Sequence, residues 1–97
     1  MFLILLNYVK PLAVIEQHLA SHREFLQRHY AQGTLLLSGR KEPRNGGVIL
    51  ARADSLAEVE ALIREDPFHR AGAAEYQIIE FVPTMAAEAL RDLAGLV

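Results

Sequence analysis

The chain has 97 residues, of which 52% are hydrophobic and 23% are charged, and its net charge is −2. This length fits one domain, and the composition is typical of a globular chain rather than a disordered one. The interspersed charges leave no basic patch for nucleic acid, and no stretch approaches the ~20 apolar residues of a membrane span. The absence of cysteine favours a reducing cytoplasm.

The first half of the chain predicts a strand, a long helix and a hairpin. Residues 2–9 are apolar apart from Asn7, a pattern typical of a central strand that is covered on both faces. Residues 12–32 have the length and pattern of a helix, and Gly33 is suited to end it with a left-handed cap. Residues 34–38 and 47–52 then predict two strands around a turn rich in glycine, with proline and asparagine.

The second half predicts a helix, a last strand and a helical tail. Ser55 with Glu58 three residues later has the form of a capping box at a helix start. Asp66-Pro67 is expected to stop that helix, because the residue before proline avoids the α region. Residues 74–82 predict the fourth strand, and 85–96 predict a short terminal helix.

This β-α-β-β-α-β order is typical of a ferredoxin-like α+β domain, with a four-stranded antiparallel sheet and two helices on one face. The domain is expected over residues 1–83, with residues 84–97 as a helical tail. The strands carry apolar residues on both faces, so the face without helices would remain apolar. Such a face marks an interaction surface, and an isologous homodimer would cover it.

The long helix contains a histidine at a position that predicts burial. At about 100° per residue, His22 lies in the same apolar stripe as Ile15 and Leu19, whereas Arg23 lies on the wet side. A histidine on a buried face must satisfy its ring nitrogens or face a cavity. It is therefore either a structural residue with a backbone partner or a proton shuttle.

The other histidines do not predict a metal site. His18 and His22 have the i, i+4 spacing that can share a metal, but a zinc site needs a third protein ligand. His18 and His29, at the edge of the stripe, are expected to be surface histidines, and nothing in the sequence places His69. No metal and no other cofactor is predicted.

Five further residues are candidates for a site. Asp66, expected at a helix C-terminus, is either a turn aspartate or a carboxylate that orients a histidine. Tyr8 and Ser38 could bond a ligand or only the surrounding chain, and Arg40 and Arg70 could hold an anionic group or be solvated. Motifs for nucleotide, dinucleotide and acyl-transfer chemistry are absent, so hydride transfer, nucleotide hydrolysis and classical acyl transfer are not expected.

Several of these pieces, taken in order, resemble a known family. They are the Leu-Ile-Leu-Leu-Asn-Tyr strand at 3–8, His22 in a long helix, the segment 33–39, and Asp66-Pro67-Phe68 with Ala71-Gly72 just beyond. The sequence thereby resembles the YciI-like (YCII-related) domain over about residues 1–83.

The resemblance implies a fold, an assembly and a site. It implies a dimeric α+β barrel, in which two ferredoxin-like sheets pack face to face, and an active site built from His22 and Asp66. The family often has Ser-Gly-Pro at the end of the second strand, where this chain has Arg40 in place of proline. The rim of the pocket or the charge of its ligand is therefore expected to differ.

Together these features suggest a small-molecule enzyme that uses His22 as general acid or base, with Asp66 holding the ring tautomer. Isomerisation, elimination or water addition on a small cyclic or aromatic metabolite would fit, because no nucleophile is required. The alternative is a non-catalytic module that binds or senses a small ligand. A purely structural interaction domain is a third possibility.

Overall fold

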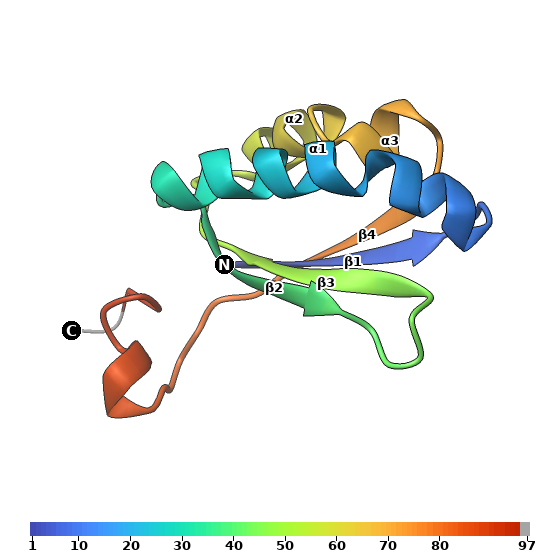
Figure 1. Ribbon diagram of the computed structural model, residues 1–97. Helices are drawn as coiled ribbons and strands as arrows, with labels where there is room; N and C mark the ends of the chain where they lie inside the picture. The colour runs from blue at the N-terminus through green and yellow to red at the C-terminus, as the bar shows by residue number, and fades with distance from the viewer. Residues whose placement is uncertain (96–97) are drawn as a thin grey trace.

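The computed structural model describes residues 1–95, and it places three helices on one face of a four-stranded antiparallel sheet (Figure 1). The elements in chain order are β1 (Phe2–Tyr8), α1 (Leu12–Ala31), β2 (Leu35–Arg40), β3 (Gly46–Ala51), α2 (Leu56–Arg64), α3 (Pro67–Arg70), β4 (Ala74–Glu80) and the 3-10 turn η1 (Glu88–Leu90). The sheet order is β2-β3-β1-β4. The predicted ferredoxin-like α+β fold is confirmed.

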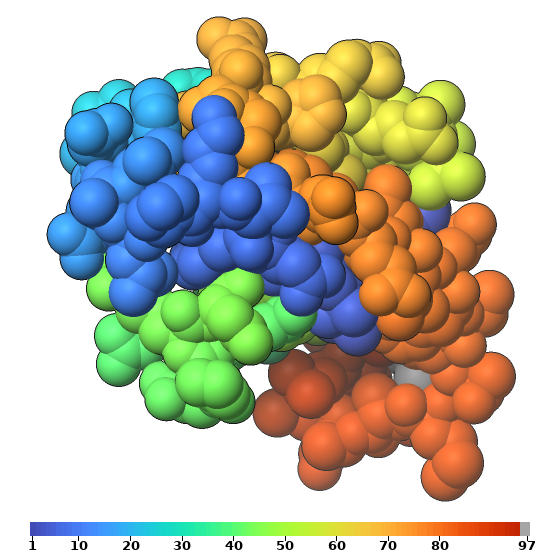
Figure 2. All heavy atoms as spheres, turned by 90° about the vertical axis from the view of Figure 1, so that its right-hand side faces the viewer, coloured from blue at the N-terminus to red at the C-terminus, as the bar shows by residue number. Residues whose placement is uncertain are grey.

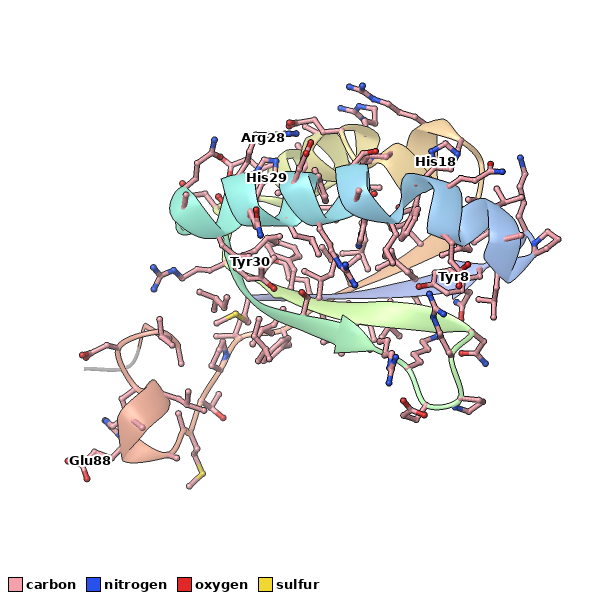
Figure 3. The ribbon with its side chains drawn as sticks, viewed as in Figure 1. Tyr8, His18, Arg28, His29, Tyr30 and Glu88 are labelled. Carbon is pink, nitrogen blue, oxygen red and sulfur yellow. The ribbon has the colours of Figure 1, made fainter. Side chains whose placement is uncertain are left out.

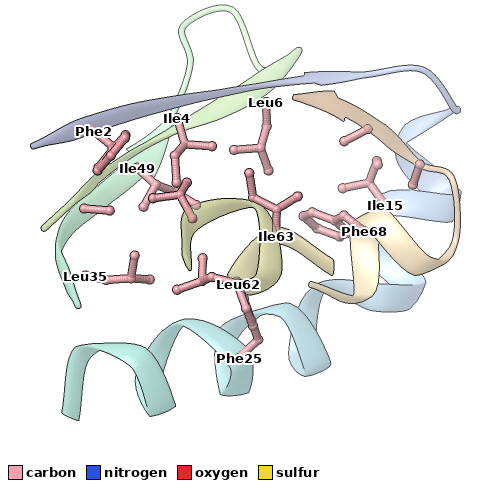
Figure 4. Packing of buried hydrophobic residues seen from close by; sticks show 14 residues of the cluster. Phe2, Ile4, Leu6, Ile15, Phe25, Leu35, Ile49, Leu62, Ile63 and Phe68 are labelled. Atoms are coloured by element: carbon pink, nitrogen blue, oxygen red, sulfur yellow. The ribbon is translucent and has the colours of Figure 1, made fainter. Parts of the chain in front are cut away.

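The hydrophobic core lies between the sheet and the helices. Along β1 the side chains of Phe2, Ile4 and Leu6 are buried and point toward the helices (Figure 4), whereas Leu3 and Leu5 point to the other face and are half-buried. This alternation is that of a strand covered on one side. Within the single chain β1 is covered on one face, and cover of its other face by a second copy stays a prediction.

The open face of the sheet is apolar across three strands. Leu3 of β1 pairs with Leu50 of β3, and Leu50 pairs with Leu37 of β2, so these side chains share one face. Leu37 is 62% exposed. An apolar sheet face of this kind is typical of an interaction surface.

The segment around Asp66 differs from the prediction in one respect. Helix α2 begins as expected, since the Ser55 hydroxyl accepts a hydrogen bond from the Glu58 backbone N–H at 3.2 Å. Helix α2 ends at Arg64, but Pro67 then begins the short helix α3, and Asp66 is its N-cap. Asp66 therefore begins a helix rather than standing only at the end of one, because proline fits the first position of a helix.

A close approach of two strands fixes one end of the sheet. A Cβ atom on Gly46 would lie 1.8 Å from the Leu6 carbonyl oxygen, so only glycine fits there. Beside this contact, the Tyr8 N–H donates to the Asn45 carbonyl at 2.9 Å. These contacts bring the β2–β3 turn against the end of β1, where Tyr8 and Gly47 line a cavity described below.

The tail is less helical than predicted. Strand β4 ends at Glu80, and the terminal helix expected over 85–96 is reduced to η1 and turns, with residue 96 outside the described residues. The tail runs away from the layer of helices (Figure 1), and Arg52 donates to the Leu93 carbonyl at 3.2 Å. No residue of 81–95 is buried and Met85 is 88% exposed, so the packing of this segment is too sparse to stabilise a longer helix.

No helix among residues 1–95 has the length and apolar character needed to cross a membrane.

Candidate functional site

A cavity of about 290 Å³ lies between α1 and the part of the sheet formed by β1, β3 and β2. It opens to solvent near the β2–β3 turn, and Figure 2 shows a notch between that turn and the start of α1. The lining residues are Leu6, Tyr8, Leu19, His22, Arg23, Leu26, Ser38, Gly39, Arg40, Gly47, Val48, Ile49 and Phe68.

His22 joins this cavity to a buried carboxylate. Its Nδ1 atom lies 2.8 Å from Oδ1 of Asp66, and the two side chains are 12% and 1% exposed. These are the two residues that the family resemblance pairs, and they are in direct contact. The bond occupies Nδ1 and leaves Nε2, on the far side of the ring, available to the cavity that His22 lines.

Asp66 accepts hydrogen bonds on both of its carboxylate oxygens. The backbone N–H of Phe68 donates to Oδ1 at 3.0 Å, and the hydroxyl of Tyr76 donates to Oδ2 at 2.8 Å. An ionised carboxylate can only accept, so the proton in its bond to His22 belongs to Nδ1. The arrangement therefore selects the tautomer of His22 in which Nε2 is unprotonated and basic.

Tyr76 is held in its protonated form. Burial, reinforced by the neighbouring Asp66 carboxylate, raises the pKa of Tyr76 well above its usual range. Its hydroxyl thus remains a donor at neutral pH and keeps one oxygen of Asp66 satisfied. Tyr76 therefore restrains the carboxylate that restrains His22.

The imidazole of His22 is also fixed by an aromatic neighbour. Its ring stacks on Phe68 with centroids 4.1 Å apart and an angle of 17° between the planes. Tyr8 meets Phe68 edge-on, with centroids 5.9 Å apart. Phe68 is 1% exposed, so it forms a rigid wall behind both rings.

Most of the other predicted site residues also line the cavity. Tyr8, Ser38 and Arg40 do so, and the Ser38 hydroxyl forms a hydrogen bond with the hydroxyl of Tyr30, which extends from α1 toward β2 (Figure 3). Arg70 does not line the cavity. It is exposed, and its Nε donates to the carbonyl of Arg64 at 3.4 Å, because α3 directs it toward α2.

Two residues of this region were not predicted from the sequence. Arg23 lines the cavity although its position on the helix is on the wet side. Its long side chain reaches a cavity mouth that helical spacing alone does not reveal. Tyr76 contacts Asp66 from β4, ten residues away, and nothing in the local sequence marks that contact.

One histidine is placed differently from the prediction. His29, expected at the surface, is 6% exposed and packs edge-on against Phe25, with centroids 5.0 Å apart. Its Nε2 lies 3.4 Å from Glu65, because the end of α2 comes beside α1. Within residues 1–95, no group of three or more histidine, cysteine, aspartate or glutamate side chains is arranged to hold a metal ion.

Comparison with known proteins identifies the family. The model of the YCII-related domain matches residues 1–82. The chain belongs to the YCII-related domain family. The resemblance inferred from the residues is confirmed, and the match covers the sheet, the three helices, His22 and Asp66.

A protein of similar sequence is "Uncharacterized protein YjpA" of Bacillus subtilis (strain 168), which is 35% identical over 66 residues. That alignment covers 68% of this chain and 78% of YjpA. Among solved structures, "5-chloro-2-hydroxyhydroquinone dehydrochlorinase (TftG)" from Burkholderia phenoliruptrix AC1100, in complex with 2,5-dihydroxybenzoquinone, matches with a TM-score of 0.71 at 20% identity. The match covers 84% of this chain and 93% of TftG, and it supports the fold.

Proposed function

We propose that this YCII-domain protein is an enzyme that transfers protons on a small cyclic or aromatic metabolite. The observation that carries the proposal is the bond between His22 and buried Asp66 at the wall of an open cavity. The pair supplies a nitrogen that can accept a proton at the cavity and a carboxylate that stabilises the resulting cation. A general base needs both features.

The proposed chemistry begins with Nε2 of His22. This atom takes a proton from a carbon or hydroxyl group of the ligand, and the carboxylate of Asp66 stabilises the imidazolium that forms. In isomerisation or elimination, the imidazolium then returns the proton to a different atom of the ligand or to a leaving group. In hydration His22 instead takes the proton from the attacking water, and the imidazolium protonates a ligand carbon. Isomerisation, elimination and hydration all follow from this exchange, and none of them requires a nucleophile or a cofactor.

The structural neighbour is consistent with this class of reaction. TftG is named for the removal of hydrogen chloride, and its structure holds a six-membered dihydroxyquinone ring. Elimination of hydrogen chloride removes a proton and releases chloride, so it requires a base but no redox partner. We therefore propose a hydroxylated ring compound as the first class of substrate to test. We include Tyr8, Ser38 and Arg40 in the proposed substrate site because they line the cavity.

The test follows proton transfer directly. The protein is incubated in D₂O with a panel of cyclic enols, lactones and hydroxylated aromatic rings, and deuterium incorporation is followed by ¹H NMR. Chloride release from 5-chloro-2-hydroxyhydroquinone is followed in parallel. We expect accelerated exchange or chloride release for at least one compound, and a loss of about 10²–10⁴-fold in the His22→Gln variant.

The matched control is His18→Gln, a histidine one turn earlier on α1 that does not line the cavity. Its rate should equal that of the wild type. Compounds that bind in the cavity without any exchange or release would favour the alternative, a module that binds or senses a small ligand.

We further propose that the folded unit is residues 1–83, with 84–97 as a tail, and that two copies form a homodimer, a dimeric α+β barrel, in the cytoplasm. The apolar open face, which includes the half-buried Leu3 and the exposed Leu37, supports the dimer. Burying such a face in an isologous interface removes apolar surface from water in both copies at once. The lack of cysteine is consistent with a reducing compartment.

The mass of the protein in solution tests whether it is a dimer. Light scattering at micromolar concentration should give about twice the chain mass of 10.8 kDa. Leu37→Lys should shift the protein to monomer, because burying a charge in an apolar interface is costly. Leu56→Lys, which places the same charge on an exposed leucine of α2, is the control and should remain dimeric. A wild-type monomer at every concentration contradicts the dimer.

A further inference from the structure

The cavity beside His22 has a charge opposite to that of the chain. The chain carries a net charge of −2, yet the cavity lining holds Arg23 and Arg40, and it contains no aspartate or glutamate. The carboxylate of Asp66 lies behind the His22 ring and is 1% exposed, so its charge is directed at His22 rather than at the cavity. A ligand therefore meets two guanidinium groups at the cavity wall.

Neither guanidinium group is held strongly by other side chains. Within residues 1–95, Arg23 forms no hydrogen bond and no ion pair, and it follows His22 directly on α1. Arg40 lies 3.3 Å from Glu42, but these two side chains are 68% and 77% exposed. An ion pair so open to water is weak, so a bound anion can compete with it.

The apolar residues of the cavity lining are suited to bind the ring of a ligand. Leu19, Leu26, Ile49 and Phe68 contribute apolar side chains around His22. An apolar cavity of about 150 Å³ is large enough to hold a benzene molecule. The cavity of about 290 Å³ therefore has room for one substituted ring together with a charged group.

Building on the function proposed above, we propose that the substrate class is a planar ring compound that carries an anionic oxygen group, a carboxylate or an enolate-type oxygen. Arg23 and Arg40 bind the anionic group, and the apolar side chains hold the ring beside Nε2 of His22. Removal of a proton by His22 builds negative charge on such a ligand. The two arginines are then placed to stabilise this charge as it develops.

The test is a comparison of three probes by titration calorimetry and by NMR shifts of cavity residues. Benzoate supplies a ring and a charge, benzamide has the same shape without the charge, and acetate has the charge without the ring. We expect benzoate to bind with a dissociation constant in the millimolar range or below. Its affinity should be at least about tenfold higher than the affinity of benzamide or of acetate. The NMR signals of Tyr8, His22 and Phe68 should shift when benzoate is added.

Variants assign the selectivity to the arginines. Arg23→Gln should weaken benzoate binding by about tenfold and leave benzamide binding unchanged. Arg40→Gln should have a smaller effect of the same kind, because Glu42 already engages that side chain. Arg28→Gln is the control, since Arg28 is exposed on the same helix, on the side turned away from the sheet (Figure 3).

Three outcomes overturn the inference. They are equal binding of benzoate and benzamide, an effect of Arg28→Gln as large as that of Arg23→Gln, and no binding of benzoate at millimolar concentration. The first two leave acid–base chemistry by His22 intact, because binding is measured here without any reaction. Conversely, if benzoate binds charge-selectively but no compound exchanges protons, the proposed anion site is supported and the proposed enzymatic activity is contradicted.

Discussion

The Asp66→Ala variant is expected to lose roughly 3–5 kcal/mol of the free energy of unfolding, the largest stability effect of a substitution in the site. Asp66 is 1% exposed and accepts from Phe68, Tyr76 and His22. Alanine leaves one buried and two partly buried donors without an acceptor, and each such donor costs about 1–3 kcal/mol when water does not replace the partner. The N-cap of α3 is lost as well.

Urea unfolding measures this loss, and Asp54→Ala provides the comparison. Asp54 is an exposed aspartate before α2, so its replacement should change stability by no more than about 0.5 kcal/mol. If the two variants unfold at the same urea concentration, the hydrogen bonds of Asp66 do not hold α3 and β4 together as described.

The Asp66→Asn variant is expected to retain most of the stability and to lose about 10²-fold in the rate of proton transfer. The Tyr76 hydroxyl can donate or accept, whereas the Phe68 N–H can only donate. The amide should therefore turn its oxygen toward Phe68 and His22 and its NH₂ toward Tyr76. The hydrogen bonds survive, but the negative charge that stabilises the imidazolium is lost.

The Asp66→Asn variant separates the effect of the negative charge of Asp66 from the effect of its hydrogen bonds. The rate is measured with the compound that exchanges fastest in the wild type, and stability is measured in parallel by urea unfolding. A wild-type rate in Asp66→Asn would mean that the carboxylate only positions the ring. A loss of stability as large as that of Asp66→Ala would mean that the amide cannot adopt the expected orientation.

The fold was predictable because several local signals agree. The apolar strands, the capping box at Ser55 and the glycine after the long helix each mark a boundary, and their order allows few topologies. The tail was predicted less well. Leucine at helical spacing suggests a helix, but spacing alone cannot stabilise a helix that has no core beside it.

The candidate site was predictable in part. Helical spacing placed His22 on the inner face, and the family resemblance paired it with Asp66 before any distance was known. Tyr76 and Arg23 were missed for different reasons. The contact of Tyr76 depends on where β4 passes α3, which is a property of tertiary structure. The position of Arg23 at the cavity depends on the reach of a long side chain and not on the direction of its Cα–Cβ bond.

The central claim is that Asp66 holds His22 with Nε2 unprotonated toward the cavity. The most direct measurement is the pair of ¹⁵N chemical shifts of the His22 ring in its neutral form, compared between the wild type and Asp66→Ala. We expect a protonated Nδ1 and an unprotonated Nε2 in the wild type, and a mixture of tautomers once the carboxylate is removed. A protonated Nε2 in the wild type, or identical ring shifts in the two proteins, would contradict it.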